Sequence, residues 1–202
     1  MSFWSQASSE PRRQHRFLLA FPNLGGYQEY LAKTVTKPSF TIGETEHKFL
    51  GNTYYYPGAV TWETVTAQLV NAVAPDGNAI FYRALYAAGY FDPGDQQGKF
   101  TGDGANSDFP GPGTPNKLDA QAALGSVLIK EINGAGALIG TWKLNNPWIT
   151  NVKFGDLDYS GEELLNIDLT LRYDWATYTG GPGDNSMRIP AANMAAANRS
   201  VE

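Results

Sequence analysis

The chain lacks the residues that most site chemistries need. Its 202 residues include no cysteine, so a disulfide, a thiolate nucleophile and a Cys-ligated metal are excluded. The only two histidines, His15 and His47, lie far apart, and no Gly-x-Ser-x-Gly motif accompanies them. A lone histidine on a strand or hairpin is more often a surface or interface residue than a ligand. We therefore expect a protein that is not an enzyme and that holds no cofactor and no metal.

Positive charge and long apolar runs are also scarce. The chain carries 20 Asp and Glu against 15 Lys and Arg, for a net charge of −5. This balance argues against DNA binding by phosphate neutralisation, which needs clustered Lys and Arg. No apolar run approaches a membrane span, and the start, MSFWSQASSEPRRQ, does not have the regions of a signal peptide. We expect folding in a cytoplasm, without membrane insertion by this chain.

What is present is a globular composition, with 42% hydrophobic and 17% charged residues. We expect an N-terminal arm at residues 1–13, a β-domain at residues 14–178 and a flexible C-terminal tail at residues 179–202. Residues 91–125 form an insertion in the domain. Its first part, 91–114, is dense in Gly, Pro and Asp and has no period, which predicts a long surface loop.

Short strands are predicted over most of this domain. Alternating or β-branched segments indicate them at residues 16–21, 31–42, 60–70, 126–132, 137–144 and 148–154. Residues 43–58 are predicted to form an extended hairpin, with turn signals at Gly51-Asn52 and Pro57-Gly58. A tight hairpin is expected at Asn145-Asn146-Pro147.

The apolar period changes to that of a helix over residues 75–90. The apolar residues of one helical face are Ile80, Phe81, Ala84, Leu85 and Ala88. Asp76 can cap the start of this helix, and Gly89 can end it. A second, short helix is expected from residues 114 to 124, with Gly125 as its stop.

The clearest strand signal lies in LLNIDLTLRYDWATY, residues 164–178. Apolar or aromatic residues alternate with polar ones from Leu165 to Trp175, which predicts one long strand with a dry face and a wet face. Such a strand runs over about 30 Å. The fold class expected from all elements is mainly β: an antiparallel β-sandwich or barrel with one packed α-helix.

Aromatic residues separate into two groups. Those on the apolar phase of their strands are expected in the core; they are Trp142, Trp148, Trp175, Tyr173 and Phe154. The consecutive Tyr54, Tyr55 and Tyr56 cannot all face one side of a strand, so at least one points outward. Exposed aromatics mark a sugar-binding platform or a protein interface, and the neighbouring turns favour an interface.

Three segments resemble functional motifs, but each is better explained as a turn or a loop without a bound ligand. The glycines of GAGALIG, residues 134–140, are followed by a strand and not by the helix that a dinucleotide site requires. The 103–108 segment lacks the alternating ligands and closing Glu of a calcium loop. The densest acidic cluster, residues 156–163, could pair two carboxylates as acid and base, but a charged turn before a strand is the preferred interpretation.

Three stretches together resemble the tail tube proteins of contractile-tailed phages, which are related to the inner-tube proteins of contractile injection systems. They are YYYPGAVTWETVTAQL (54–69), the helix containing FYRALYAAG (81–89), and WKLNNPWITNVKFGDLDYSGEELLNIDLTLRYDWATY (142–178). The resemblance covers residues 14–90 and 126–178, and the last stretch is its most specific part.

The resemblance implies a structural virion protein. In that family six subunits form a ring, their strands merge into one multi-subunit barrel, and stacked rings make the inner tail tube through which the genome is ejected. The implied partners are further copies of the chain, the tail sheath, baseplate and tail terminator proteins, and a tape measure protein in the lumen. DNA passes without specific binding, and the location is a virion tail assembled in the host cytoplasm.

Two sets of residues become site candidates on this basis. Glu63, Asp168 and Asp174 are candidates for the channel wall, where excess carboxylates keep DNA from sticking. Candidates for contacts between stacked rings are Glu44, Glu46, His47 and Lys48. The 91–114 loop is expected to project outward.

Alternative functions remain open from the sequence. The chain could form the inner tube of a non-viral contractile injection system. Its five Trp and eleven Tyr also suit a carbohydrate-binding β-sandwich. A glycosidase using the 156–163 carboxylates is a further alternative.

Overall fold

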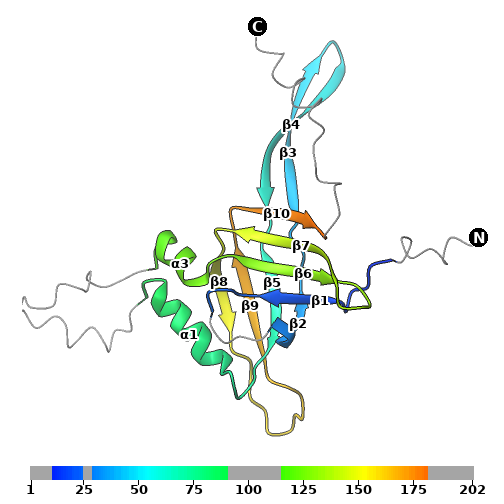
Figure 1. The fold of residues 1–202 in the computed structure, drawn as a ribbon. Helices are drawn as coiled ribbons and strands as arrows, with labels where there is room; N and C mark the ends of the chain where they lie inside the picture. The colour runs from blue at the N-terminus through cyan, green and yellow to red at the C-terminus, as the bar shows by residue number, and fades with distance from the viewer. Residues whose placement is uncertain (1–10, 25–28, 91–114, 182–202) are drawn as a thin grey trace, which may run out of the picture.

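Two four-stranded antiparallel sheets, a long projecting hairpin and two α-helices make up the described part of the chain (Figure 1). The computed structural model describes residues 11–24, 29–90 and 115–181. The strands are β1 (Phe17–Ala20), β2 (Ala32–Val35), β3 (Phe40–Phe49), β4 (Asn52–Trp62), β5 (Val65–Val70), β6 (Val127–Ile132), β7 (Leu138–Asn145), β8 (Trp148–Lys153), β9 (Asn166–Arg172) and β10 (Trp175–Gly180). The helices are α1 (Gly77–Ala87), α3 (Lys117–Leu124) and the short 3-10 helix η3 (Glu29–Leu31).

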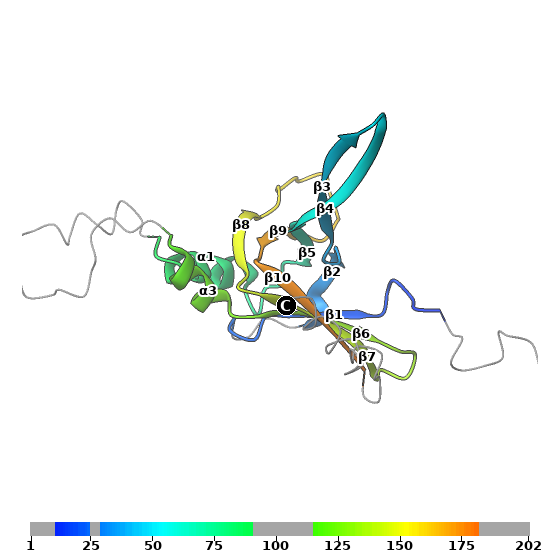
Figure 2. The ribbon, with the colours of Figure 1, turned by 90° about the horizontal axis from the view of Figure 1, so that it is seen from above.

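The sheets have the strand orders β1-β6-β7-β10 and β2-β5-β9-β8. Among the described strands, β3 pairs only with β4. The predicted mainly β fold with antiparallel sheets is therefore confirmed, although the described strands of one chain do not close a barrel. The two α-helices lie side by side next to β8 (Figures 1 and 2). Within the described residues, α1 is the predicted packed helix and α3 is the second, short helix expected before Gly125.

The core lies between the two sheets and under α1. Alternation along β5, β6 and β9 directs one apolar face of each strand inward. The largest fully buried core side chains include Leu19, Leu69, Phe81, Ile129, Leu144, Ile167, Leu169 and Leu171. Phe81 of α1 meets Phe21 edge-on, with 6.2 Å between the ring centroids, which fixes the helix on the sheets.

Both helices begin and end at the kinds of residue that the sequence indicates. The Asp76 side chain accepts a 2.9 Å hydrogen bond from the Asn78 N–H, and Gly89 follows the helix with a φ of 99°. In α3 the cap is Asn116, which accepts from the Asp119 N–H, and Gly125 ends the helix. The first helix is confirmed as predicted, and the second starts slightly later than expected.

The single long strand predicted at 164–178 is wrong. The chain breaks at Tyr173 and Asp174, and β9 and β10 belong to different sheets. The Asp174 N–H donates to the carbonyl of Asn145, 3.1 Å away, at the crossing. Burial also changes phase there, because Ala176 turns inward while Trp175 is exposed. The sequence alternation continues through the break, so it could not reveal the crossing.

The tight hairpin predicted at residues 145–147 is also wrong, although a tight turn is present. Its flanking strands, β7 and β8, lie in different sheets and do not pair. Asn146 adopts a left-handed φ of 53°, and its side-chain amide donates to Asp174 Oδ2 at 2.9 Å. Two crossings between the sheets therefore meet at one corner of the molecule.

Two further expectations near the hairpin need correction. The strand predicted at 60–70 is divided into β4 and β5, with Glu63 in the gap. The pair Pro57-Gly58 is no turn but lies inside β4, beside a register shift between Ile42 and Glu44. The tip of the hairpin is at Leu50 and Gly51, which have positive φ values of 48° and 80°. The turn signal at Gly51-Asn52 is confirmed.

The aromatic residues expected in the core behave differently from one another. Tyr173 is buried, and Trp142 is half-buried against the core. Trp148, Trp175 and Phe154 are exposed, so that expectation is wrong for them. Trp148 and Trp175 lie on β8 and β10, the outermost strands of their sheets, where alternation no longer guarantees a covering layer.

Candidate functional site

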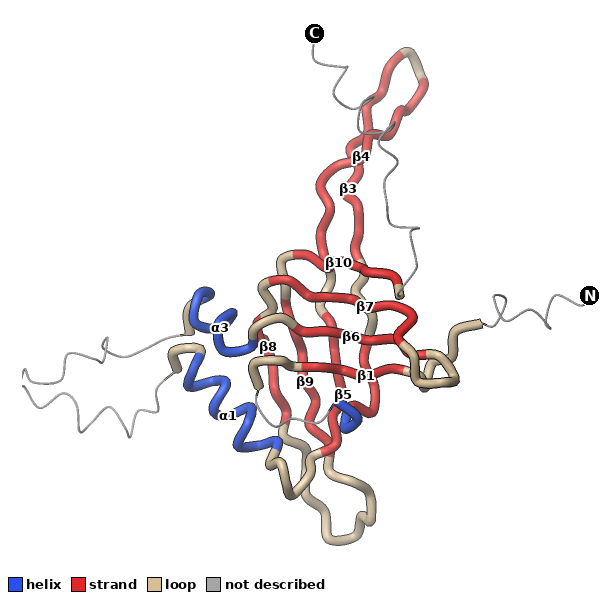
Figure 3. Tube along the Cα trace, in the orientation of Figure 1, coloured by secondary structure: helices blue, strands red, loops and turns tan. Residues whose placement is uncertain are grey.

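The β3–β4 hairpin is the most unusual surface of the chain. It projects as a two-stranded arm from one end of the body (Figures 1 and 3). Every residue of β3 is exposed, and so is every residue of β4 except Trp62. An isolated two-stranded hairpin is marginally stable in water, because neither face is covered. Among the described residues, none pairs with the outer edges of the hairpin, and both of its faces are exposed.

Apolar and aromatic side chains occupy much of this exposed hairpin. The large exposed ones are Phe40, Ile42, Phe49, Leu50, Tyr54, Tyr55, Tyr56 and Val60. Tyr55, for example, is 64% exposed and Leu50 is 85% exposed. All three consecutive tyrosines are exposed, which confirms that at least one must point outward. Large exposed apolar and aromatic side chains gathered on one hairpin favour an interaction site.

The register places the predicted ring-contact residues on both faces of the hairpin. Glu46 lies opposite Tyr55, and His47 lies opposite Tyr54. Because side chains alternate along a strand, Glu44, Glu46 and Lys48 share one face and His47 lies on the other. Lys48 Nζ is 3.3 Å from Glu46 Oε1, in an exposed ion pair. All four candidates lie on the projecting hairpin, and their contact with another ring stays a prediction.

The base of the hairpin is tied to the described body by aromatic packing and a backbone hydrogen bond. The Trp62 ring lies 5.3 Å from the Phe40 ring and 5.9 Å from the Tyr173 ring, measured between centroids. The Glu63 N–H donates to the carbonyl of Ser39 at 2.9 Å. This aromatic cluster fixes the direction in which the hairpin leaves the two sheets, while the exposed remainder of the hairpin is not covered by the described part of the body.

The structure does not bring the three channel-wall candidates together. Asp168 lies near the start of β9 and accepts a 3.0 Å hydrogen bond from the Gln68 side chain. Glu63 lies between β4 and β5 near the opposite end of that sheet. Asp174 follows β9 and receives Lys117 Nζ at 2.8 Å. Hydrogen bonds from Lys117 and Asn146 lower the pKa of Asp174, so this carboxylate supports the corner between the sheets.

The outer edges of two sheets offer backbone groups for pairing. In the described part of the chain, β10 and β2 each pair with another strand on one side only. The Trp175 side chain is exposed on β10. An unpaired edge with an exposed aromatic residue can template a strand from another chain.

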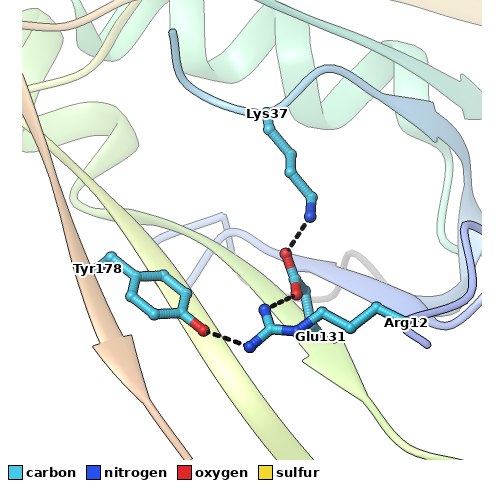
Figure 4. Close-up of polar contacts among 4 residues, drawn as sticks. All are labelled: Arg12, Lys37, Glu131 and Tyr178. Carbon is cyan, nitrogen blue, oxygen red and sulfur yellow. Dashed lines mark hydrogen bonds and ion pairs between the residues drawn. The ribbon is translucent and has the colours of Figure 1, made fainter. Parts of the chain in front are cut away.

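A buried carboxylate, which the sequence interpretation missed, joins four segments of the fold (Figure 4). Glu131 of β6 is 5% exposed. Arg12 Nη1 and Lys37 Nζ each approach one of its carboxylate oxygens to 2.5 Å, and Arg12 also donates to the Tyr178 hydroxyl at 3.0 Å. Burial opposes ionisation, but the two cations outweigh it and lower the pKa of Glu131. The available signal was a Glu at an inward position of VLIKEI.

The acidic loop at residues 154–165 joins β8 to β9 and is exposed over nearly all of its length. Lys153 Nζ lies 2.7 Å from Asp156 Oδ2, and Asp158 accepts from both the backbone and the hydroxyl of Ser160. Those hydrogen bonds lower the pKa of Asp158. A general acid of a glycosidase needs a raised pKa, so this carboxylate does not suit the role. The loop is a charged turn, as the preferred interpretation had it.

Other site types have little support in the described residues. These residues contain no group of three or more His, Asp or Glu side chains placed to hold a metal ion. None of the described helices is long and apolar enough to cross a lipid bilayer. The predicted surface loop at 91–114 lies outside the described residues. So do residues 1–10 of the predicted arm and residues 182–202 of the predicted tail, while β10 includes residues 179 and 180.

No protein-family model and no curated protein matches the sequence. Similar folds occur among solved structures. A chain of the six-fold symmetrised anti-feeding prophage baseplate matches with a TM-score of 0.53 and 17% identity, covering 85% of this chain and 97% of that one. A chain of the sheath/tube terminator of the extracellular contractile injection system PVC gives 0.54 and 16%, with coverages of 85% and 98%.

A chain of the PVC sheath–tube complex in its extended state matches with a TM-score of 0.50 and 16% identity, over 87% of this chain and 99% of that one. At these identities the likeness concerns the fold. It extends over nearly the whole length of each matched chain. The resemblance drawn from the sequence is confirmed at this level: the chain has the fold of subunits found in contractile injection systems.

Proposed function

We propose that this chain is a structural subunit that assembles with copies of itself into a tube. The observation that carries the proposal is the β3–β4 hairpin, whose apolar and aromatic side chains no part of the described chain covers. Leaving such a surface in water is unfavourable, because burial of apolar area drives association. A neighbouring copy supplies the missing cover. The role is mechanical and not catalytic.

The proposed unit is a ring of six, stacked into a tube. Six-fold symmetry is a property of the anti-feeding prophage baseplate, whose chain has a similar fold. The free edges of β10 and β2 favour a head-to-tail contact, which pairs edges around a ring when the rotation closes. Strands from all copies then merge into one barrel. The hairpin, with Glu44, Glu46, His47 and Lys48, reaches the next ring.

The proposed tube is the inner tube of a contractile phage tail and conducts the genome. Its subunits carry a net charge of −5, which opposes condensation of DNA phosphates on the wall. We keep Glu63, Asp168 and Asp174 as proposed wall residues. The exposed Asp168 suits this role best, because Asp174 already pairs with Lys117.

The proposed partners follow from the same role. They are the sheath, baseplate, tail terminator and tape measure proteins, and the location is a virion tail. A non-viral injection device is the second candidate, because the matched chains come from injection systems. Electron microscopy of tails from the source, with this chain identified by mass spectrometry, separates the two: phage tails carry a DNA-filled head.

Negative-stain electron microscopy of the purified protein tests the self-assembly. We expect rings or hollow rods of uniform width whose abundance rises with protein concentration. A matched variant, Tyr54→Ser/Tyr55→Ser/Tyr56→Ser, should remain folded by circular dichroism but form far fewer rods. Protein that stays monomeric at high concentration, with no rings, would show that the proposed function is wrong.

A further inference from the structure

A cationic cleft lies beside β1 and β2, and the proposed function leaves it without a role. It has a volume of about 510 Å³. The basic residues that line it are Arg12, Arg13, His15, Arg16, Lys33 and Lys37, against one described carboxylate, Glu131. Its apolar lining includes Val35, Ile129 and Ile139. This is a concentration of positive charge in a chain that is acidic overall.

Internal ion pairs use only part of this charge. Arg12 and Lys37 are held by Glu131 (Figure 4). Arg13 and Lys33 are exposed, and neither forms an ion pair with another described residue. The Glu131 cluster therefore fixes the cleft in shape, while Arg13 and Lys33 remain available on its rim.

Complementary chemistry occurs on the acidic loop at residues 154–165. Its carboxylates are Asp156, Asp158, Glu162 and Glu163, and within the described chain only Asp156 has an ion pair, with Lys153. Leu157 of the same loop is 88% exposed and Leu164 is 70% exposed. Figures 1 and 2 place this loop and residues 11–16 on different sides of the body.

We propose that the acidic loop of one copy docks in the cationic cleft of the neighbouring copy. The proposal rests on the proposed self-assembly and names two surfaces that meet in it. Arg13 and Lys33 pair with Glu162 and Glu163, and Leu157 packs on the apolar lining of the cleft. Because the two surfaces are different parts of one chain, the contact is head-to-tail and repeats from copy to copy.

A second copy fits the cleft better than a nucleic acid does. Phosphate contacts need cations but no apolar lining, and a chain of net charge −5 repels a polyanion at long range. The loop complements both the positive charge and the apolar lining of the cleft, because it carries carboxylates together with exposed apolar side chains. Opposite charges on facing surfaces also select the register between copies.

Charge reversal tests the contact in full-length protein. The cleft variant is Arg13→Glu/Lys33→Glu and the loop variant is Glu162→Lys/Glu163→Lys. None of these four side chains has a hydrogen bond or ion pair to a described residue, so both variants should fold normally by circular dichroism. Each alone should raise the protein concentration needed for assembly by about tenfold or more, since like charges then face each other. The control Arg83→Glu, an exposed site on α1, should have no such effect.

Mixing the two defective variants provides the decisive measurement. An equal mixture should assemble nearly as well as the unmodified protein, because each reversed cleft then meets a reversed loop and each native cleft meets a native loop. Carbodiimide cross-linking of assemblies made from equal amounts of ¹⁵N-labelled and unlabelled unmodified protein should join Lys33 to Glu162 or Glu163 in mixed-isotope pairs.

Several results would overturn the docking without affecting the proposed function. One is unmodified protein and both variants assembling equally well. Another is Lys33 cross-linked only within its own copy, or only to residues 1–10 or 182–202. A third is loss of double-stranded DNA binding in the cleft variant with normal assembly, which would make the cleft a polyanion site. Unmodified protein that never assembles would overturn both proposals.

Discussion

Shortening the β3–β4 hairpin should separate folding of the subunit from its assembly. The change removes residues 43–59 and joins Ile42 to Val60 through Asn-Gly, a sequence that suits a two-residue hairpin turn. The base of the hairpin is retained, because Phe40 and Trp62 remain to pack on Tyr173. All the removed residues are exposed.

The expected change in the free energy of unfolding is small. Burying an aliphatic or aromatic side chain fully contributes about 1.5–3 kcal/mol, but the removed side chains are not covered by the body. Shortening a loop changes its closure entropy only by about 0.6 kcal/mol for each halving of length. We therefore expect the unfolding free energy to change by no more than about 1 kcal/mol. Assembly should be lost, because the projecting part of the apolar surface, with Phe49, Leu50 and the three tyrosines, is gone.

Urea denaturation followed by circular dichroism, at concentrations where the protein is monomeric, measures the first quantity. Negative-stain microscopy of concentrated protein measures the second. A loss of about 3 kcal/mol or more would mean that the hairpin supports the core, as a buried side chain does. Normal rods from the shortened protein would show that the hairpin is not an assembly surface. Either result would refute the reasoning.

Three further outcomes are expected. Phe81→Ala should lower the unfolding free energy by about 3–5 kcal/mol in urea denaturation, because the 1% exposed ring fills the space between α1 and the sheets. The control is Tyr82→Ala, at an exposed position of the same helix. An equal loss of unfolding free energy in the two variants would contradict this packing. The pKa of Glu131 is lowered in the folded protein, so the stabilisation from its carboxylate is complete above the ordinary pKa of glutamate and is lost as pH falls through the folded pKa. Glu131→Gln should therefore be less stable than the unmodified protein at pH 7, and its unfolding free energy should fall less steeply in acid. Parallel curves of unfolding free energy against pH for the two proteins would argue against an ionised Glu131. Gly140→Ala should displace the Tyr178 ring, which a Cβ at residue 140 would overlap, and should destabilise the protein in thermal unfolding. The control is Gly161→Ala, whose Cβ would lie 3.8 Å from the Asp158 carbonyl oxygen, an ordinary van der Waals contact. An unchanged melting temperature for Gly140→Ala would refute the close contact.

The sequence predicts those parts of the fold that local periodicity determines. The helix capped by Asp76 is found with its expected start, and the strands around Leu69, Ile129 and Leu169 have the expected buried faces. These succeed because alternation and capping are properties of neighbouring residues. The hairpin and its outward tyrosines were also predictable, since three consecutive aromatic residues cannot all face one layer.

The site was predictable only in outline. The hairpin was singled out by its turn and its aromatic run, and the structure shows its exposure. The Glu131 cluster was not foreseen, because Arg12, Lys37 and Tyr178 meet it from segments far apart in the sequence. The separation of Asp168 from Asp174 was also missed. Both residues occupy polar positions of one alternating sequence pattern, but the strand that contains Asp168 ends at Arg172.

By itself the sequence determined that the chain is mainly β, has a core-facing helix and holds no cysteine chemistry, because composition and local period are read from residues in order. Only the tertiary structure decided which strands share a sheet. Asn146 and Asp174 turn two apparently continuous segments into crossings between sheets, and this depends on a hydrogen bond between residues 28 positions apart. Alternation gives the direction of each side chain relative to its own strand, but the layer that covers it comes from the whole fold.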